Sequence, residues 1–219
     1  MTLEVLQNPS IELDAVIDEM RRKGYSVDDG MDRSLNIVGI RRRPLRVDAF
    51  NDVLFVFHPL RGQWQYQKFQ ITTIPGNAYL AGKLGNSRGT AILVPGQYVD
   101  MYTVREHGGG SRKHRALCQK HGTTLPVYRD ARLNGVPDLD PSSIENNGTG
   151  INLHRASPVD CTISVGDYSS GCQTFRCSQQ FAAFMALVRS SAGYPSNTFT
   201  YTLLDQEGWG SSPHTRAPV

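Results

Sequence analysis

The sequence predicts an α+β fold that is mostly β, a sandwich or mixed sheet flanked by two helices. Residues 11–25 and 178–193 carry apolar side chains at helical spacing. Much of the remaining chain consists of short runs rich in β-branched and aromatic residues, separated by turn-forming residues. Because each helix is apolar on one side, we expect both to cover a face of the sheet.

Each helix is recognised by an apolar stripe and by its ends. The stripe of the first helix consists of Leu13, Val16, Ile17 and Met20. The stripe of the second consists of Phe181, Phe184, Met185 and Val188. Ser10 is the expected N-cap of the first helix and Gly24 its expected end. Ser178 and Gly193 are the corresponding residues of the second helix.

The strands are expected where β-forming residues lie between turns. These segments are residues 36–41, 52–58, 64–73, 90–94, 98–105, 116–119, 126–129, 151–154 and 198–204. No linker or repeat divides the 219 residues, so we expect a single domain over residues 1–209. Residues 210–219 are small, polar and proline-containing, which predicts a flexible C-terminal tail.

Charge and hydropathy exclude several classes of protein. Lys and Arg number 23 against 20 Asp and Glu, a net charge of +3, which argues against a nucleic-acid-binding protein. No apolar run is long enough to cross a bilayer. The first residues lack the basic and apolar regions of a signal peptide. We therefore expect synthesis in the cytoplasm, with a separate export route for any action outside it.

The four cysteines do not form a recognisable metal motif. They are Cys118, Cys161, Cys172 and Cys177. No pair is arranged as CxxC, and the spacing of Cys172 and Cys177 is unusual for zinc. Without a secretion signal, free thiols are expected rather than a disulfide framework. One of them is then a candidate nucleophile.

A histidine and a cysteine stand in a pattern that suits thiol catalysis. His154 ends the expected strand at 151–154, and Cys172 follows 18 residues later in a turn that contains Ser169, Ser170 and Gly171. A neutral thiol needs a base to attack a carbonyl, and an imidazole can take its proton. Consecutive N–H groups of the turn are candidate donors to the oxyanion that forms.

This pattern resembles the catalytic signature of the L,D-transpeptidase family. The resemblance rests on Gly150-Ile151-x-x-His154, Val165-Gly166 and Ser169-Ser170-Gly171-Cys172, about 30 residues in all. It implies an L,D-transpeptidase-like β-sandwich acting on peptidoglycan without a cofactor or metal. Cys172 would be the nucleophile and His154 the base, oriented by the carbonyl of Arg155. The N–H groups of Gly171 and Cys172 would bind the oxyanion, and Ser169 would tie the loop together.

The resemblance has departures that bear on the reaction. Arg155 stands where the family usually has glycine or serine after the histidine. Gln173 and Thr174 replace the small apolar residue and the arginine that usually follow the cysteine, and Arg176 comes later. That family arginine helps to hold substrate. In this sequence the candidate substrate-binding residues around the cysteine are Ser170, Gln173 and Arg176. The departure favours hydrolysis over the formation of cross-links.

Two other groups of residues are candidate sites. Residues 130–140 faintly follow a calcium-binding loop, with oxygen ligands at Asp130, Asn134 and Asp138, but Arg132 stands at a ligand position and an ordinary acidic turn is favoured. The segment contains three carboxylates, Asp130, Asp138 and Asp140. The same carboxylates would suit glycan cleavage if they lined the cleft. His107, His114 and His121 recur every seven residues without the other ligands of a zinc site. Three glycines between His107 and His114 predict a mobile basic loop, a lid beside Cys172.

Three functions are therefore considered. The first is a peptidoglycan hydrolase that cleaves the stem peptide through a Cys–His thioester, as a phage endolysin released by a holin or an effector injected by a secretion system. The second is a muramidase-like glycosidase that uses the acidic residues. The third is a non-catalytic wall-binding or virion module. Their common partner is bacterial peptidoglycan, and neither nucleic acid nor membrane insertion is expected.

Overall fold

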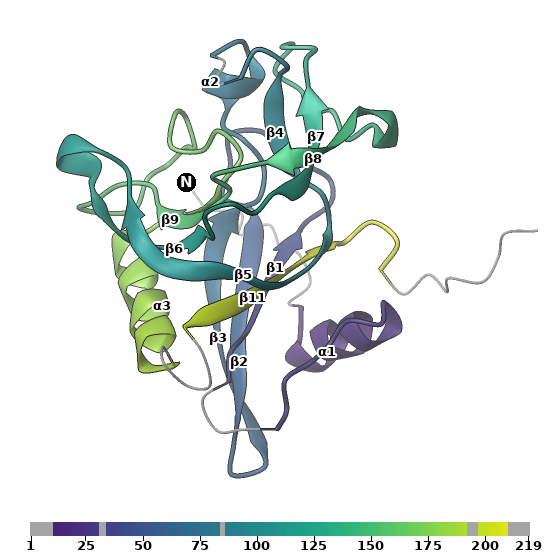
Figure 1. Cartoon of the computed structure of the whole chain (residues 1–219), viewed down its shortest axis with the longest axis vertical. Helices are drawn as coiled ribbons and strands as arrows, with labels where there is room; N and C mark the ends of the chain where they lie inside the picture. Colours follow the sequence, from purple (N-terminus) through teal and green to yellow (C-terminus); the bar gives the residue numbers. More distant parts are fainter. Residues whose placement is uncertain (1–10, 31–33, 84–85, 192–196, 210–219) are drawn as a thin grey trace, which may run out of the picture.

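The main body of the computed structural model is a mixed sheet that closes into a barrel. The structure describes residues 11–30, 34–83, 86–191 and 197–209. Within them, the strands follow the order β1-β11-β5-β6-β9-β10-β3-β2 (Figure 1). Their bounds are β1 Asn36–Arg41, β2 Asp52–Leu60, β3 Gln63–Thr72, β5 Gly96–His107, β6 His114–Gln119, β9 Leu153–Arg155, β10 Gln173–Phe175 and β11 Thr198–Asp205. The barrel closes because β1 pairs with β11 on one side and with β2 on the other.

The mostly β, mixed-sheet prediction is confirmed, although the strands form a barrel rather than two stacked layers. The β1–β11 and β9–β10 pairs are parallel and the other pairs of the barrel are antiparallel. A second sheet has the order β4-β7-β8, with β4 at Thr90–Leu93, β7 at Leu125–Asp130 and β8 at Ile144–Gly148. Leu93, Leu125 and Val127 of this sheet belong to the same buried apolar cluster as the barrel interior.

Helix α1, Leu13–Arg22, covers the outer surface of the barrel beside β1 and β2 (Figure 1). Successive residues of a strand face opposite sides, so Val38 and Phe55 point outward while Ile37 and Leu54 point into the barrel. The predicted stripe of Leu13, Val16, Ile17 and Met20 is buried against this outer face. The helix ends where expected, since Gly24 has a positive φ of 73°. The expected N-cap, Ser10, lies outside the described residues.

Helix α3, Ser178–Ser191, packs beside the short strands β9 and β10. Its predicted stripe joins the interior cluster, and Phe184 lies against Phe175 of β10 with ring centroids 4.9 Å apart. The remaining regular segments are α2 at Asn77–Leu80, η1 at Gly110–Arg112 and η2 at Pro141–Ser143. Among the described residues, no helix is both long and apolar enough to span a membrane. The expected helix end at Gly193 and the tail at 210–219 lie outside the described residues.

A tyrosine inside the barrel holds the strand that follows the cysteine. Tyr201 of β11 is fully buried, and its hydroxyl donates to Oε1 of Gln173 at 3.0 Å. The ring passes over Gly39 of β1, where a Cβ atom would collide with the Tyr201 hydroxyl. Gly39 therefore makes room for a hydrogen bond that links opposite walls of the barrel and fixes Gln173.

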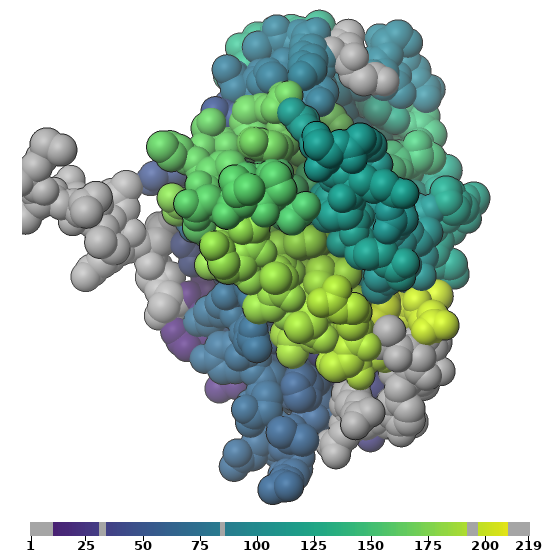
Figure 2. All heavy atoms as spheres, turned by 90° about the vertical axis from the view of Figure 1, so that its left-hand side faces the viewer, coloured from purple at the N-terminus to yellow at the C-terminus, as the bar shows by residue number. Residues whose placement is uncertain are grey.

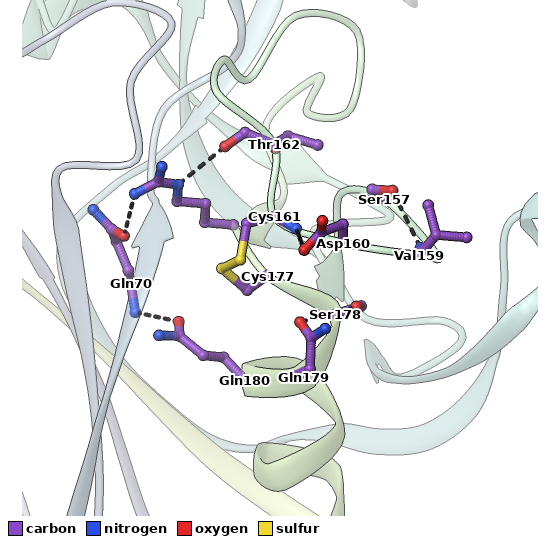
Figure 3. Close-up of a disulfide and its surroundings, with 11 residues drawn as sticks. Gln70, Ser157, Val159, Asp160, Cys161, Thr162, Cys177, Ser178, Gln179 and Gln180 are labelled. Carbon is purple, nitrogen blue, oxygen red and sulfur yellow. Dashed lines mark hydrogen bonds between the residues drawn. A yellow bond between two sulfur atoms is a disulfide. The ribbon is translucent and has the colours of Figure 1, made fainter.

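Cys161 and Cys177 form a disulfide (Figure 3). The expectation that all four thiols are free is wrong for this pair, while Cys118 and Cys172 are free and buried. The chain after β9 folds back so that Cys161 forms an antiparallel bridge with Cys177, just beyond β10. The disulfide therefore closes a loop that contains residues 162–176, including the cysteine of the expected motif.

Candidate active site

Parallel pairing of β9 and β10 brings His154 and Cys172 to one face of the barrel wall. His154 is paired with Thr174, and Cys172 precedes Thr174 by two residues. Residues two apart in a strand share a face. Both side chains line a cavity of about 410 Å³, which confirms that they lie on neighbouring segments beside one cleft.

Cys172 is more enclosed than expected. Its relative exposure is 6%, so the prediction that it would be partly exposed is wrong, whereas Cys118 is buried as predicted. The Cys172 thiol donates to the carbonyl of Gly150 at 3.2 Å, and its sulfur accepts the N–H of Asn152 at 3.4 Å. Burial raises the pKa of the Cys172 thiol to about 11. Cys172 is therefore a protonated thiol at neutral pH.

His154 is a neutral base with a defined tautomer. Its Nδ1 lies 2.8 Å from the carbonyl oxygen of Arg155, as predicted. A carbonyl only accepts hydrogen bonds, so Nδ1 carries the hydrogen and Nε2 the lone pair. Burial, together with the nearby imidazoles of His107 and His114, lowers the pKa of His154 to about 3. The Nε2 lone pair accepts a hydrogen bond from the Thr174 hydroxyl at 3.3 Å.

The expected hydrogen bond between His154 and Cys172 is not formed in this state. Among the described contacts, the thiol is held by Gly150 and the imidazole by Thr174. The buried thiol and the buried imidazole therefore each have a hydrogen-bond partner other than one another. A direct hydrogen bond between them would require the thiol to leave the Gly150 carbonyl and Nε2 of His154 to leave the Thr174 hydroxyl.

The turn that carries Cys172 is held by Ser169. Its hydroxyl donates to the Cys172 carbonyl at 2.8 Å and accepts the Gly171 N–H at 3.3 Å, which confirms its predicted role. Gly171 has a φ of 135°, a region that favours glycine, and a Cβ there would collide with the Ala91 carbonyl. Because Ser169 occupies the Gly171 N–H, Gly171 is not the oxyanion donor that was expected. No hydrogen bond of the described residues uses the Cys172 N–H.

The structure separates the predicted substrate-binding residues. Ser170 and Arg155 line the large cavity, and Ser170 also borders a second cavity of about 170 Å³ that Cys172 lines as well. Gln173 alternates with Cys172 and points into the barrel, where it binds Tyr201. The Arg176 guanidinium donates to Thr162 and Gln70 beside the disulfide, and it lines neither cavity (Figure 3). Gln173 and Arg176 are thus structural.

The segment from His107 to His114 is the end of the β5–β6 hairpin, with η1 at its tip. It lies beside the loop between β9 and β10, above α3 (Figure 2). The expected position beside Cys172 is confirmed, since both histidines line the same cavity. Arg112 of the tip lies over the ring of Tyr168 and 3.8 Å from Asp167 in the facing loop. The mobility of this segment as a lid stays a prediction.

Three imidazoles meet at this end of the hairpin. His107 stacks on His154 with ring centroids 4.2 Å apart and an interplanar angle of 24°. His114 approaches His107 at 5.4 Å and His154 at 6.2 Å. His121 is not part of the cluster and contacts Arg105 instead. Asn152 and Thr174 were missed, although each stands two residues from a motif residue and so shares its face.

The acidic residues serve local structure. Asp130 is fully buried and accepts the backbone N–H groups of Arg132 and Asp138. Asp140 caps η2. None of Asp130, Asp138 and Asp140 lines the two cavities beside Cys172. Within the described residues, no group of three or more His, Cys, Asp or Glu side chains is arranged to hold a metal ion.

The chain matches no protein-family model, no curated protein and no solved structure. What the site can do chemically therefore follows from its own residues. A neutral base and a protonated thiol share one cavity, with a free backbone N–H on the thiol-bearing residue. These are the groups needed for acyl transfer to sulfur.

The charge state of the pair predicts an unusual pH profile. His154 has a lowered pKa of about 3 and stays unprotonated in mild acid, and Cys172 has a raised pKa of about 11 and stays a thiol. We therefore expect the rate of Cys172 acylation by p-nitrophenyl acetate to be nearly constant from about pH 5 to about pH 8. The rate should fall only at lower pH, when His154 is protonated. A stopped-flow profile that falls to half near pH 6.5 would contradict this, and free N-acetylcysteine is the control, with a rate that rises about tenfold per pH unit.

Proposed function

We propose that this chain is a peptidoglycan-degrading cysteine hydrolase that cleaves an amide bond of the stem peptide. The observation that carries the proposal is the neutral His154 imidazole, held at Nδ1 by the Arg155 carbonyl, in one cavity with the Cys172 thiol. A backbone oxygen at Nδ1 fixes the tautomer that places the lone pair on Nε2. Nε2 can then exchange the hydrogen bond of the Thr174 hydroxyl for the thiol proton. His154 is the base that a buried, protonated thiol requires.

The reaction proceeds through a thioester. The Cys172 thiol gives its proton to Nε2 of His154 as its sulfur bonds to the acyl carbon. The π electron pair of the carbonyl moves to oxygen and then returns, so that the C–N bond breaks and the amine leaves with the proton from His154. Water, activated by the same imidazole, then attacks the thioester and releases the acid and the thiol.

Several features support a cell-wall substrate. The segments Gly150–His154 and Ser169–Cys172 resemble the L,D-transpeptidase signature, and an L,D-transpeptidase-like arrangement of the barrel is part of this proposal. Arg155 places positive charge on the cavity that would receive stem-peptide carboxylates, whereas Arg112 is paired with Asp167, which lines the same cavity. The Cys161–Cys177 disulfide suits an oxidising compartment outside the cytoplasm. We propose release through a holin or a secretion system.

Two residues favour hydrolysis over cross-linking. Gln173, directly after the nucleophile, points into the barrel, and Arg176 is held by Thr162 and Gln70. Neither can hold a second peptide in the cavity as the arginine of the resembling family does. Water is then the acceptor of the acyl group, and the two cavities that Cys172 lines have volumes of about 170 and 410 Å³.

Digestion of purified sacculi tests this function. We expect soluble fragments with new amino and carboxyl groups on the stem peptides, each cleavage adding one water to the mass. New reducing ends without new amines would mean glycan cleavage and would overturn the proposal. Joined stem peptides, formed with release of the leaving amine and without addition of water, would show transpeptidation instead. Mass spectrometry of the fragments distinguishes these results.

A further inference from the structure

We infer that His107 is a further catalytic residue, which donates a hydrogen bond from Nε2 to the oxyanion formed when Cys172 attacks an acyl group. This inference rests on the proposed thiol chemistry, but it does not depend on the identity of the acyl substrate. It follows from three observations: the tautomer of His107, its position, and the shortage of other donors at Cys172.

The tautomer of His107 is fixed through Asn152. The backbone N–H of Gln119 donates to Oδ1 of Asn152 at 3.0 Å, so the other end of that amide is its NH₂ group. This NH₂ group lies 3.1 Å from Nδ1 of His107 and donates to it. Nδ1 is then the acceptor nitrogen, and the neutral imidazole carries its hydrogen on Nε2. Burial lowers the pKa of His107 to about 4, so the ring is neutral at physiological pH.

The N–H at Nε2 is available to a ligand. His107 lines the same cavity as Cys172. No described residue bonds to its Nε2, and this atom is not among the fully buried unpaired atoms, whereas Nε2 of His114 is. His107 is also linked to Cys172 through one residue, because Asn152 donates its side-chain amide to the His107 ring and its backbone N–H to the Cys172 sulfur.

The oxyanion needs a second donor. Sites for acyl transfer usually present two or more preorganised N–H groups to the developing charge. Here the Gly171 N–H is taken by Ser169, which leaves the Cys172 N–H from the turn. The Nε2–H of His107, which lines the same cavity, supplies the missing donor.

The two stacked histidines therefore have opposite tasks. His154 presents a lone pair at Nε2 and takes the thiol proton, while His107 presents an N–H at Nε2 and binds the oxygen. When sulfur bonds to the acyl carbon, the π electron pair moves to that oxygen, and the His107 hydrogen bond strengthens without transfer of its proton. The pair returns to carbon as the leaving group departs.

The test compares acylation with alkylation of Cys172 in the full chain. Acylation by p-nitrophenyl acetate forms an oxyanion and is followed by the burst of p-nitrophenolate, whereas alkylation by iodoacetamide forms none. His107→Phe keeps a stacking ring but removes the donor, and we expect it to slow acylation by about 10²-fold. Alkylation should stay within about twofold, because the base and the thiol are untouched. His107→Gln, which places an amide N–H near the same point, should recover most of the acylation rate.

His58→Phe is the matched control, since His58 is a half-buried histidine on β2 that lines neither cavity. The rate of Cys172 acylation in this variant should not change. Equal loss of acylation in His107→Phe and His107→Gln, or no loss in either, would overturn the inference. Loss of both acylation and alkylation would mean that His107 only shapes the site, which also overturns it. If sacculi are not digested but acylation depends on His107, the proposed substrate fails and the inference about His107 stands.

Discussion

Cys172→Ala is expected to abolish hydrolysis of sacculi, with a loss of at least about 10⁴-fold in kcat. Cys172 is the one free cysteine of the described residues that borders both cavities. The Thr174 hydroxyl also lies 3.3 Å from Nε2 of His154, but Thr174 is fully buried and lines neither cavity, so it cannot meet a substrate there. Removal of the sulfur leaves His154 with no proton to accept and no thioester to form. The burst of p-nitrophenolate should vanish as well.

Cys118→Ala is the matched control for this change. Cys118 is the other free, buried cysteine, and it lies in β6 outside both cavities. Both substitutions remove one small buried sulfur and should cost a similar free energy of unfolding, about 1 kcal/mol. If Cys172→Ala still hydrolyses sacculi and has the same melting temperature as Cys118→Ala, thiol catalysis is ruled out. Activity lost in both variants would show that packing, not chemistry, is being measured.

The helices and most strands could be predicted because they depend on local periodicity. The apolar residues from Leu13 to Met20 recur at helical spacing, and Phe199, Tyr201 and Leu203 recur at strand spacing. In both segments the spacing itself identifies the face that is buried. Closure of the barrel could not be predicted in the same way. It depends on parallel pairing of β1 with β11, for example Ile37 with Tyr201, across most of the chain length.

The same distinction between local pattern and distant contacts applies to the residues of the candidate site. His154, Cys172 and Ser169 were identified by their sequence pattern, and the carbonyl of Arg155 by its position next to His154. His107 and Asn152 could not be assigned roles, because their contact depends on the hairpin end reaching across β6 to β9. Gln173 and Arg176 were misassigned, since their neighbours Tyr201 and Gln70 come from distant strands.

The disulfide was missed for a different reason. Pairing of cysteines depends on the distance between them in the fold and on the redox state of the compartment, and neither is encoded in spacing. Cys161 lies in an irregular loop, while Cys177 directly precedes α3. The two approach each other only because Arg176 and Thr162 hydrogen-bond side by side, with Thr162 N–H donating to the Arg176 carbonyl at 3.1 Å.

Loss of this disulfide is expected to destabilise both the fold and the site. Cys161 and Cys177 are separated by 16 residues, and opening a loop of that size costs about 3 kcal/mol in the free energy of unfolding. For a chain of this length the double variant Cys161→Ser/Cys177→Ser should lose roughly 6 to 12 °C in Tm. The freed loop carries Ser169 and Cys172, so hydrolysis should also fall at temperatures where the variant is still folded.

Dithiothreitol separates the disulfide from the side effects of substitution. Reduction should lower the Tm of the parent protein and of Cys118→Ala by the same amount, because Cys118 is not part of the disulfide. The double variant should not respond, since it has no disulfide to reduce. Mass spectrometry shows whether Cys161 and Cys177 have been reduced. If they have, and the Tm and activity of the parent protein are unchanged, the hydrogen bonds of Arg176 with Thr162 and Gln70 hold the loop without the disulfide. The expected result is that these contacts are too few to replace the covalent link, because each hydrogen bond adds only about 1 kcal/mol.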